Sequence, residues 1–320
     1  MSEYSCSKVA PPCIRRIGIF GAGTIGSSWA AFYASRGIEV KLFDINPEDL
    51  DKGLAKTVQY LNDLLKFDLA DKKIIKEAFK KIQTVNSVAA LVEDIEFVHE
   101  SVFENYDVKK EIFAKVDELA SPSTIIASSS SGLLMTEIQK VMNYPQRALI
   151  AHPFNPPHLI PLVELVPGKQ TNPEIIKTMY DFYQELGKIP VVLKKEVPGH
   201  IANRLAVALW REAIELVATG VASVEDVDKA LYAGPGIRWA LMGQHLIYHL
   251  GGGEGGYEYF INHIGKEFEK YQMASWTKIP EDAKEAIISG VKESLGGRSL
   301  SELTQWRDEK LVKLLKVIYG

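Results

Sequence analysis

The sequence predicts an α/β protein in which a doubly wound, mostly parallel sheet is followed by an all-helical C-terminal domain. Three observations support this prediction. Up to about residue 193, short apolar segments alternate with segments of helical periodicity, as in parallel sheets with crossover helices. A glycine-rich turn, GAGTIG, directly follows the first apolar segment. Beyond residue 195 the pattern is helical throughout.

The elements of the first part follow in order. A first strand at 16–20 leads through the glycine turn into a helix that ends near Arg36, and a second strand covers 39–43. The charged segment 47–80 predicts a helical hairpin. Later strands are expected at 82–85, 97–101, 124–128, 148–151, 162–166 and 189–193, and helices at 107–119, 134–141 and 173–186.

Residues 194–199, KKEVPG, interrupt the apolar pattern, so we place the domain boundary there, between domains 1–195 and 196–320. No strand is expected beyond this point. Helices are predicted at 200–219, 224–232, 239–250, 256–271, 281–295 and 300–319. Their amphipathic faces suit a substrate-binding and dimerisation domain, because apolar stripes need to be buried.

The glycine turn is typical of a Rossmann-type dinucleotide site. It consists of Gly21, Ala22, Gly23, Thr24, Ile25 and Gly26, between a strand and a helix. Gly21 permits the tight turn, Gly23 lets backbone N–H groups approach a pyrophosphate, and Gly26 allows close packing of the helix on the sheet. The helix N-terminus then faces the phosphates.

Asp44 ends the second strand, about 18 residues after the last glycine. A carboxylate there accepts hydrogen bonds from the adenosine ribose and repels a 2′-phosphate, and residues 45–47 supply no basic group. NAD is therefore expected rather than NADP. Alternatively, Asp44 caps the helix that opens at Pro47.

Size and charge narrow the function further. The chain has 320 residues and a net charge of −4, with no long basic run, so a nucleic-acid partner is not expected. Neither a membrane span nor a signal peptide is recognisable, and the chain is expected in the cytoplasm. The only cysteines, Cys6 and Cys13, suit a reducing compartment better than a disulfide framework.

Two polar residues lie in or beside apolar strands. His152, in HPFNPP, is expected just past the strand that ends at Ala151, at the carboxyl edge of the sheet where α/β proteins bind ligands. Glu164 lies within the apolar segment 162–166 and needs a partner. An imidazolium on His152 would provide one, so the two predict a general base with its orienting carboxylate. The alternative for Glu164 is a purely structural role.

Further candidates are Ser131 and Asn203. Ser131 ends a run of four serines after a strand, and its hydroxyl could hold a substrate oxygen, although serine runs are mostly polar loops. Asn203 falls in the first turn of a helix, where it either starts the helix or binds a substrate carbonyl or the Ser131 hydroxyl. His245 and His249 share a helical face, but no third ligand is evident and no metal is expected.

These motifs resemble the 3-hydroxyacyl-CoA dehydrogenase family over essentially the whole chain: the glycine loop, Asp44, Glu104-Asn105 with Lys109, Ser131, HPFNPP, Glu164 and PGHIANR. The resemblance implies that His152 is the base and Glu164 its partner, and that Ser131 and Asn203 position the substrate. It also implies that Glu104, Lys109 and Asn155 lie near the nicotinamide half of NAD. This chain has Ser129 where the family has an asparagine.

The C-terminal segments resemble a branch of the family that acts on small 3-hydroxy acids, which includes lambda-crystallin (L-gulonate 3-dehydrogenase) and L-carnitine dehydrogenases. GIRWALMG, at 236–243, replaces the Gly-Pro-Phe-Glu segment of the acyl-CoA branch, and SWTKIP and WREAIELVATGVAS resemble the carnitine enzymes most. Aromatic faces attract quaternary ammonium groups, so such a group on the substrate could bind to Trp210, Trp239 and Tyr248. Arg238 could bind the carboxylate of the same substrate. Packing between helices is the alternative for each aromatic residue.

The expected reaction is thus the NAD-dependent oxidation of L-carnitine to 3-dehydrocarnitine. L-Gulonate and 3-hydroxybutyryl-CoA remain alternative substrates, and a non-catalytic, crystallin-like structural role remains an alternative function. The resemblance also implies a homodimer.

Overall fold

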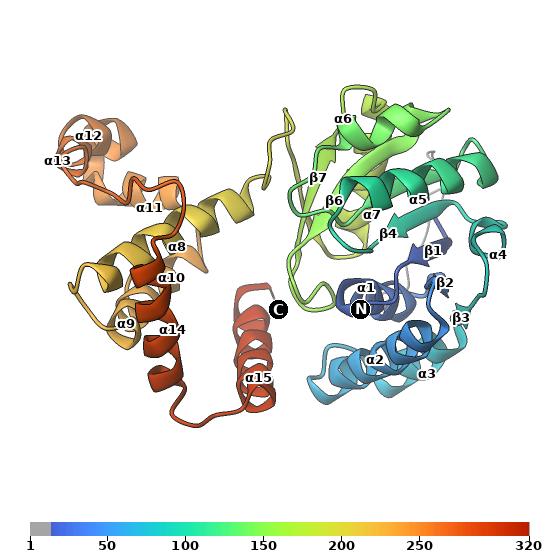
Figure 1. Cartoon of the computed structure of the whole chain (residues 1–320), viewed down its shortest axis with the longest axis horizontal. Helices are drawn as coiled ribbons and strands as arrows, with labels where there is room; N and C mark the ends of the chain where they lie inside the picture. The colour runs from blue at the N-terminus through green and yellow to red at the C-terminus, as the bar shows by residue number, and fades with distance from the viewer. Residues whose placement is uncertain (1–13, 320) are drawn as a thin grey trace. The chain divides into compact units, whose positions relative to one another are not determined.

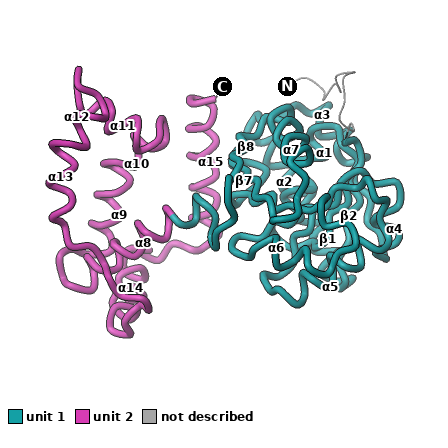
Figure 2. Tube along the Cα trace, turned by 90° about the horizontal axis from the view of Figure 1, so that it is seen from above, with its two compact units in different colours: residues 1–204 teal, residues 205–320 magenta. Residues whose placement is uncertain are grey.

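A computed structural model describes residues 14–319 of the chain, so Cys6 and Cys13 lie outside the described residues (Figure 1). The chain divides into two compact units, residues 1–204 and 205–320, which Figure 2 colours separately. The boundary expected from sequence, after residue 195, falls slightly earlier than this division. Within the described residues, no helix is long and apolar enough to cross a membrane.

The first unit contains one eight-stranded sheet. Its order is β3-β2-β1-β4-β5-β6-β7-β8, and all neighbouring strands run parallel except β6 and β7, which are antiparallel. The doubly wound, mostly parallel sheet is therefore confirmed. The strands are β1 (Arg16–Phe20), β2 (Glu39–Phe43), β3 (Ile82–Thr84), β4 (Phe97–Glu100), β5 (Ile125–Ser128), β6 (Ala148–Pro153), β7 (Leu162–Pro167) and β8 (Ile189–Val192).

The helices of this unit connect the strands. They are α1 (Thr24–Ser35), α2 (Pro47–Lys66), α3 (Lys72–Lys80), α4 (Val88–Val92), α5 (Tyr106–Leu119), α6 (Met135–Ile138) with the 3₁₀ turns at 139–141 and 145–147, and α7 (Pro173–Glu185). Side-chain oxygens cap several N-termini: Asn46 accepts from the N–H of Glu48, and Asn105 from those of Asp107 and Val108. The sequence prediction missed α4, and the helix expected at 134–141 is a short α-helix continued as 3₁₀.

The two faces of the sheet have different cores, and strand β4 contributes to both because side chains alternate along a strand. Val98 belongs to a mainly aliphatic core, which also contains a few phenylalanines, together with Val116 of α5 and Ile138 of α6. On the other face, Phe97 and His99 lie against aromatic side chains of α1 and α7: Trp29, Tyr33 and Phe182. Successive residues of β4 therefore meet chemically different surroundings.

The second unit is helical. Its elements are α8 (Ala202–Ala218), which begins in the first unit, α9 (Val224–Ala233), α10 (Pro235–Trp239), α11 (Gln244–Gly251), a 3₁₀ turn at 253–255, α12 (Gly256–Asn262), α13 (Ile264–Phe268), α14 (Glu281–Leu295) and α15 (Leu300–Tyr319). Two sequence expectations were wrong here. Trp239 ends α10 instead of opening the next helix, and 256–271 is broken at His263 into α12 and α13.

Candidate active site

A cleft of about 490 Å³ lies at the carboxyl ends of the strands of the first unit, where ligands bind in doubly wound folds. Most of the polar residues singled out in the sequence border it. The cleft is lined by Ile25, Val102, Glu104, Ser129, Ser131, His152, Pro153, Phe154, Asn155 and Asn203. Loops after β1, β4 and β5 and the end of β6 thus contribute to one site.

His152 and Glu164 form a buried pair. They are register partners in the antiparallel ladder of β6 and β7, which places their side chains on the same face of the sheet. The Nδ1 atom of His152 lies 2.8 Å from Oε2 of Glu164. His152 is within β6 rather than just after it as expected, because that strand continues to Pro153. The hydrogen bond predicted between the two residues is present.

The second oxygen of Glu164 is held by the start of helix α8. The backbone N–H groups of Ile201 and Ala202 donate to Oε1 at 2.9 and 3.0 Å. Burial alone would raise the pKa of Glu164, but the hydrogen bonds from His152, Ala202 and Ile201 outweigh burial and lower the pKa. The carboxylate therefore stays ionised, keeps the proton of neutral His152 on Nδ1, and leaves Nε2 as a proton acceptor.

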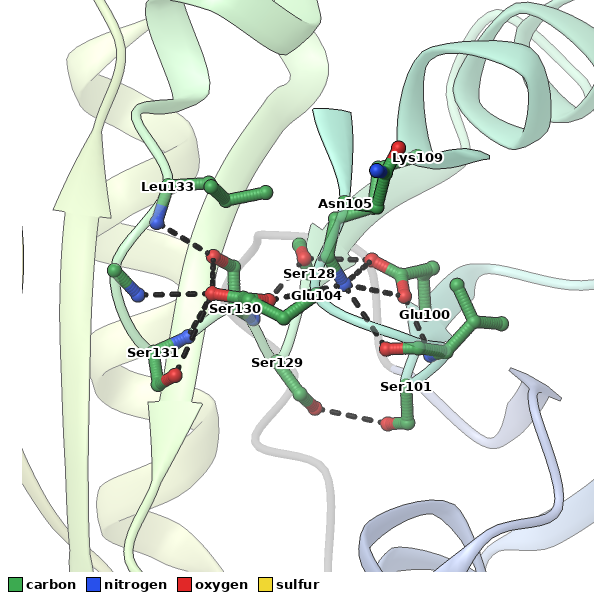
Figure 3. A network of polar contacts seen from close by, with 12 residues as sticks. Glu100, Ser101, Glu104, Asn105, Lys109, Ser128, Ser129, Ser130, Ser131 and Leu133 are labelled. Atoms are coloured by element: carbon green, nitrogen blue, oxygen red, sulfur yellow. Dashed lines mark hydrogen bonds and ion pairs between the residues drawn. The ribbon is translucent and has the colours of Figure 1, made fainter. Parts of the chain in front are cut away.

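Glu104 organises the serine loop that follows β5. Its Oε1 accepts hydrogen bonds from the Ser130 hydroxyl at 2.7 Å and from the backbone N–H groups of Ser131 and Gly132 at 2.9 and 3.0 Å (Figure 3). Burial would raise the pKa of Glu104, whereas Ser130, the Lys109 charge and the two N–H groups together lower it. Ser131 is thus positioned at the cleft by an ionised carboxylate.

Lys109 lies beneath this loop rather than in the cleft. Only 1% of its side chain is exposed, and its ammonium group donates to both oxygens of Glu100, at 2.8 and 3.0 Å. It lies 3.5 Å from Oε2 of Glu104. Glu100 also accepts from the Ser128 hydroxyl and the Val102 N–H, both at 2.6 Å. Lys109 therefore contacts the cleft through Glu104.

Asn203 contacts the serine loop, but not through the group expected. Its Nδ2 donates to the backbone carbonyl oxygen of Ser131 at 3.2 Å, and not to the Ser131 hydroxyl. The Ser131 hydroxyl lies 3.4 Å from Glu104. Asn203 is in the first turn of α8, as predicted.

The glycine loop has the geometry of a phosphate cradle. Gly21 has φ +101°, and a Cβ on Gly26 would lie 1.8 Å from the Gly21 carbonyl oxygen, so both positions require glycine. A Cβ on Gly23 would meet no protein atom within 4 Å, which leaves room for a ligand to approach the backbone. No side chain caps α1, and its N-terminal N–H groups can bind an anion. These residues fit a dinucleotide pyrophosphate.

Asp44 is attached to the same loop. Its Oδ2 accepts from the Ala22 N–H at 2.8 Å and its Oδ1 from the Asn46 N–H at 3.1 Å. The N-cap of α2 is Asn46, so the interpretation of Asp44 as that cap was wrong. The carboxylate is partly exposed at the end of β2, where a ribose hydroxyl can reach it.

Two family models match the chain: "3-hydroxyacyl-CoA dehydrogenase, NAD binding domain" over residues 16–197 and "3-hydroxyacyl-CoA dehydrogenase, C-terminal domain" over residues 199–287. The chain belongs to the 3-hydroxyacyl-CoA dehydrogenase family. It is therefore an oxidoreductase of a family that binds NAD through its first domain.

Individual relatives resemble this dehydrogenase over its full length. The L-carnitine dehydrogenases of Streptomyces coelicolor and Streptomyces griseus are 39% and 37% identical, each over 96% of this chain and over 96% and 91% of their own lengths. A solved structure, that of the NAD⁺-dependent 5-formyl-3-hydroxy-2-methylpyridine 4-carboxylic acid 5-dehydrogenase, is similar with a TM-score of 0.81. It is 27% identical and covers 96% of this chain and 99% of its own.

The substrate candidates of the dehydrogenase lie in its second unit. Trp210 of α8 is 52% exposed and Trp239 is 36% exposed, whereas Tyr248 stacks on Phe260 with ring centroids 4.4 Å apart. Trp239 also donates a hydrogen bond to Gln244. Among the described residues, Trp210, Arg238, Trp239 and Tyr248 form no hydrogen bond or ring contact with one another.

His245 and His249 both contact Tyr257: the Tyr257 hydroxyl lies 3.1 Å from His245 Nδ1, and the Tyr257 N–H donates to His249 Nδ1 at 3.0 Å. In residues 14–319, no cluster of three His, Cys, Asp or Glu side chains has a geometry that would hold a metal ion.

Sequence reasoning gave no role to two histidines that border the site. His200 is buried, its Nε2 lies 3.0 Å from the Ser130 carbonyl oxygen, and its ring centroid lies 5.2 Å from that of His152. His99 is fully buried, with Nε2 3.0 Å from the hydroxyl of Ser129, which lines the cleft. The signal for His99 was a polar residue inside an otherwise apolar strand, which needs a partner.

The burial of His99 predicts that the fold weakens in acid. Burial lowers the pKa of His99 from 6.5 to about 3. The unfolded chain therefore binds a proton between these values that the folded chain rejects, so stability is full above pH 6.5 and falls as pH decreases toward 3. From pH 7 to pH 5 this one group should cost about 2 kcal/mol of unfolding free energy.

Urea unfolding of the wild type and His99→Phe at both pH values checks this. Phenylalanine cannot titrate, so between pH 7 and pH 5 the unfolding free energy of the variant should fall by about 2 kcal/mol less than that of the wild type, whatever the stability of the variant at pH 7. Equal losses would show that His99 does not exclude the proton.

The position of Asp44 predicts cofactor preference. Asp44→Ala should weaken NAD binding by about tenfold, because ribose hydrogen bonds are lost, and should narrow the preference for NAD over NADP, because repulsion of the 2′-phosphate is removed. Titration of both cofactors, with exposed Asp49→Ala as the control, measures this. An unchanged ratio of the two dissociation constants would contradict the role of Asp44.

Proposed function

We propose that this dehydrogenase oxidises the 3-hydroxyl group of L-carnitine to give 3-dehydrocarnitine, with NAD as the acceptor. The observation that carries the proposal is the His152–Glu164 pair at the cleft beside the glycine loop. The choice of substrate is supported by relatives named L-carnitine dehydrogenase that are 37% to 39% identical over nearly the whole chain.

In this proposal His152 Nε2 takes the proton of the substrate hydroxyl group as the C3–H bond breaks. Bound NAD supplies the acceptor for the hydride from C3, so that one alcohol and NAD⁺ give one ketone, NADH and a proton. Glu164, held ionised by Ile201 and Ala202, stabilises the imidazolium as it forms.

The serine loop positions the substrate oxygen. Ser131 borders the same cleft as His152, and its backbone is held on both sides: Glu104 accepts from its N–H and Asn203 donates to its carbonyl oxygen. A loop held in this way loses little entropy when the substrate binds. The Ser131 hydroxyl can therefore hydrogen-bond to the substrate oxygen, both in the alcohol and in the carbonyl group that forms. Asn203 acts through Ser131 in this arrangement.

Recognition of the two ends of carnitine is assigned to the second unit. Arg238 is exposed and forms no ion pair within residues 14–319, so it is available for the carboxylate. The exposed faces of Trp210 and Trp239 suit a trimethylammonium group, which is attracted to aromatic rings. Tyr248, stacked on Phe260, can offer only one face.

Parallel assays of NADH formation with L-carnitine, D-carnitine, L-gulonate and 3-hydroxybutyryl-CoA test the proposal. Selective turnover of L-carnitine is expected. Turnover of L-gulonate or the acyl-CoA alone would agree with His152 as the base but would contradict L-carnitine as the substrate. NAD binding without turnover of any of the four would favour the non-catalytic, crystallin-like alternative.

A homodimer belongs to the same proposal. Large apolar side chains are exposed on the helices of the second unit, among them Leu205, Leu246 and Leu250 at 61% to 68%. Apolar surface on this scale is typical of an interface, and the partner that we propose is a second copy of the chain. Sedimentation equilibrium should give twice the chain mass of 35.6 kDa. A mass of one chain would contradict it.

A further inference from the structure

A chain of buried hydrogen bonds runs from the core between the sheet and helices α1 and α7 to the wall of the cleft. The hydroxyl of Tyr183 lies 3.0 Å from that of Tyr33, which lies 3.0 Å from Nδ1 of His99. The Nε2 atom of His99 lies 3.0 Å from the hydroxyl of Ser129. Tyr183, Tyr33 and His99 have no exposed surface. Ser129 is the member that reaches the cleft.

Strand geometry explains why these groups meet. His99 of β4 and Ser129, which follows β5, belong to the alternate set of side chains that faces α1 and α7. Glu100 and Ser128 belong to the set on the opposite face and bond to one another there. Two separate hydrogen-bond networks, one on each face of the sheet, therefore end beside each other at the end of β5. The Glu100 and Glu104 system holds the backbone of the serine loop, and the His99 system holds the Ser129 hydroxyl.

The protonation of His99 decides which group donates in each hydrogen bond from Tyr183 to Ser129. Its Nε2 also lies 3.3 Å from the carbonyl oxygen of Ala151, which can only accept. Burial keeps the pKa of His99 near 3, so the ring is neutral and carries one proton, which must be on Nε2. Nδ1 then accepts from the Tyr33 hydroxyl, and the Tyr33 oxygen accepts from Tyr183.

Ser129 is consequently an acceptor on its inner side. Its oxygen accepts the Nε2–H of His99 and lies 2.8 Å from the hydroxyl of Ser101. Figure 3 marks this contact between the two serines with a dashed line. Either serine can donate in the bond between them; with Ser101 as the donor, for which Ser129 is the one side-chain acceptor among its described contacts, both lone pairs of Ser129 are used. Its remaining hydrogen-bonding capacity is its own proton, on the side of the molecule that borders the cleft.

We propose that His99, backed by Tyr33 and Tyr183, makes Ser129 a dedicated hydrogen-bond donor in the cleft, and that the group it binds is the carboxamide oxygen of the NAD nicotinamide ring. The inference rests on the proposed function, which requires the ring beside His152. It assigns His99 as a positioning residue and Ser129 as the contact.

The chemistry of the cleft favours this ligand atom. The carboxamide has one acceptor oxygen and one NH₂ donor group, and the cleft offers a partner for each. The Ser129 proton suits the oxygen, and Oε2 of Glu104 suits the NH₂ group. Among the described interactions of Oε2, there is only the 3.5 Å contact with Lys109. An asparagine side chain could turn either its donor or its acceptor end to the ligand. Ser129 with His99 behind it fixes one polarity.

Binding of three cofactors separates this contact from a general structural effect. Titrations would use NAD, thionicotinamide adenine dinucleotide, whose sulfur is a weaker acceptor than the carboxamide oxygen, and the 3-acetylpyridine analogue, which keeps the oxygen but lacks the NH₂ group. The wild type should bind NAD more tightly than either analogue, because the thio analogue weakens the hydrogen bond from Ser129 and the acetylpyridine analogue loses the one to Glu104. Ser129→Ala should weaken NAD binding about tenfold and remove its advantage over the thio analogue.

Ser123→Ala is the matched control, because it makes the same change at an exposed serine before β5 whose hydroxyl lies 2.9 Å from that of Ser121 and which does not line the cleft. It should alter NAD affinity less than about twofold. An equal loss of affinity for NAD and the thio analogue in Ser129→Ala, or no loss at all, would overturn the contact. A wild-type protein that binds no NAD would instead refute the proposed function.

Nitrogen-15 NMR of the histidine rings tests the positioning role without a variant. His99 should be neutral with its proton on Nε2 from pH 5.5 to 9, in the presence and absence of NADH. A proton on Nδ1, or titration within this range, would overturn the assignment of Ser129 as a dedicated donor, because Ser129 would then donate to His99.

Discussion

Replacing His152 with alanine should lower kcat for alcohol oxidation by about 10²–10⁴-fold, the usual contribution of a general base. The imidazole borders the cleft, and without it Glu164 keeps the hydrogen bonds from Ile201 and Ala202 but has no imidazolium to stabilise. The dissociation constant of NAD should stay within about twofold, because the glycine loop and Asp44 are untouched. Steady-state kinetics with L-carnitine and cofactor titration by fluorescence measure the two quantities.

His263→Ala is the control for this variant. The side chain of His263 is exposed in the second unit, where its Nδ1 donates to the backbone carbonyl oxygen of Tyr259 and its ring stacks on the Tyr259 ring. Its removal should leave kcat within about twofold. Near-normal turnover by His152→Ala would exclude the proposed proton transfer, and loss of NAD binding in that variant would mean that the ring supports the cofactor instead.

The elements that sequence predicted well are those whose evidence is local. All eight strands were expected close to where they lie, because all of them except β3, whose sequence is IQT, are short and mainly apolar segments bounded by turn residues. The pairing of His152 with Glu164 was also predictable, since a carboxylate in an apolar strand needs a partner and the histidine precedes it by one strand. The helical unit was harder. Its helices break at His263 and after Trp239, where amphipathic periodicity continues across the break.

Contacts that depend on the order and alternation of strands were beyond the sequence. His99 bonds directly to Tyr33 of α1 and to Ser129 at the end of β5. Tyr33 in turn bonds to Tyr183 of α7, which is 84 residues from His99 in the sequence. Nothing local in the sequence indicates which face of β4 carries which polar residue. Lys109, which the family resemblance implies near the nicotinamide half of NAD, is buried against Glu100 and lies 3.5 Å from Glu104, which lines the cleft.

The buried position of Lys109 predicts a large loss of stability when its charge is removed. Glu100 has no exposed surface, and in Lys109→Met it would keep the Ser128 and Val102 hydrogen bonds but lose its countercharge. Breaking a buried ion pair in this way costs about 3–5 kcal/mol. Urea unfolding at pH 7 should show this loss, and NAD binding should also weaken because Glu104 loses a neighbouring cation.

Lys115→Met, on the same helix, is the control. Lys115 pairs with Glu118 at the surface, where 52% and 63% of the two side chains are exposed, so its loss should change stability by less than about 1 kcal/mol. The double variant Glu100→Gln/Lys109→Met should recover much of the stability, because a neutral amide replaces the unpaired charge. If Lys109→Met and Lys115→Met unfolded alike, the Glu100–Lys109 pair would not hold the base of the serine loop.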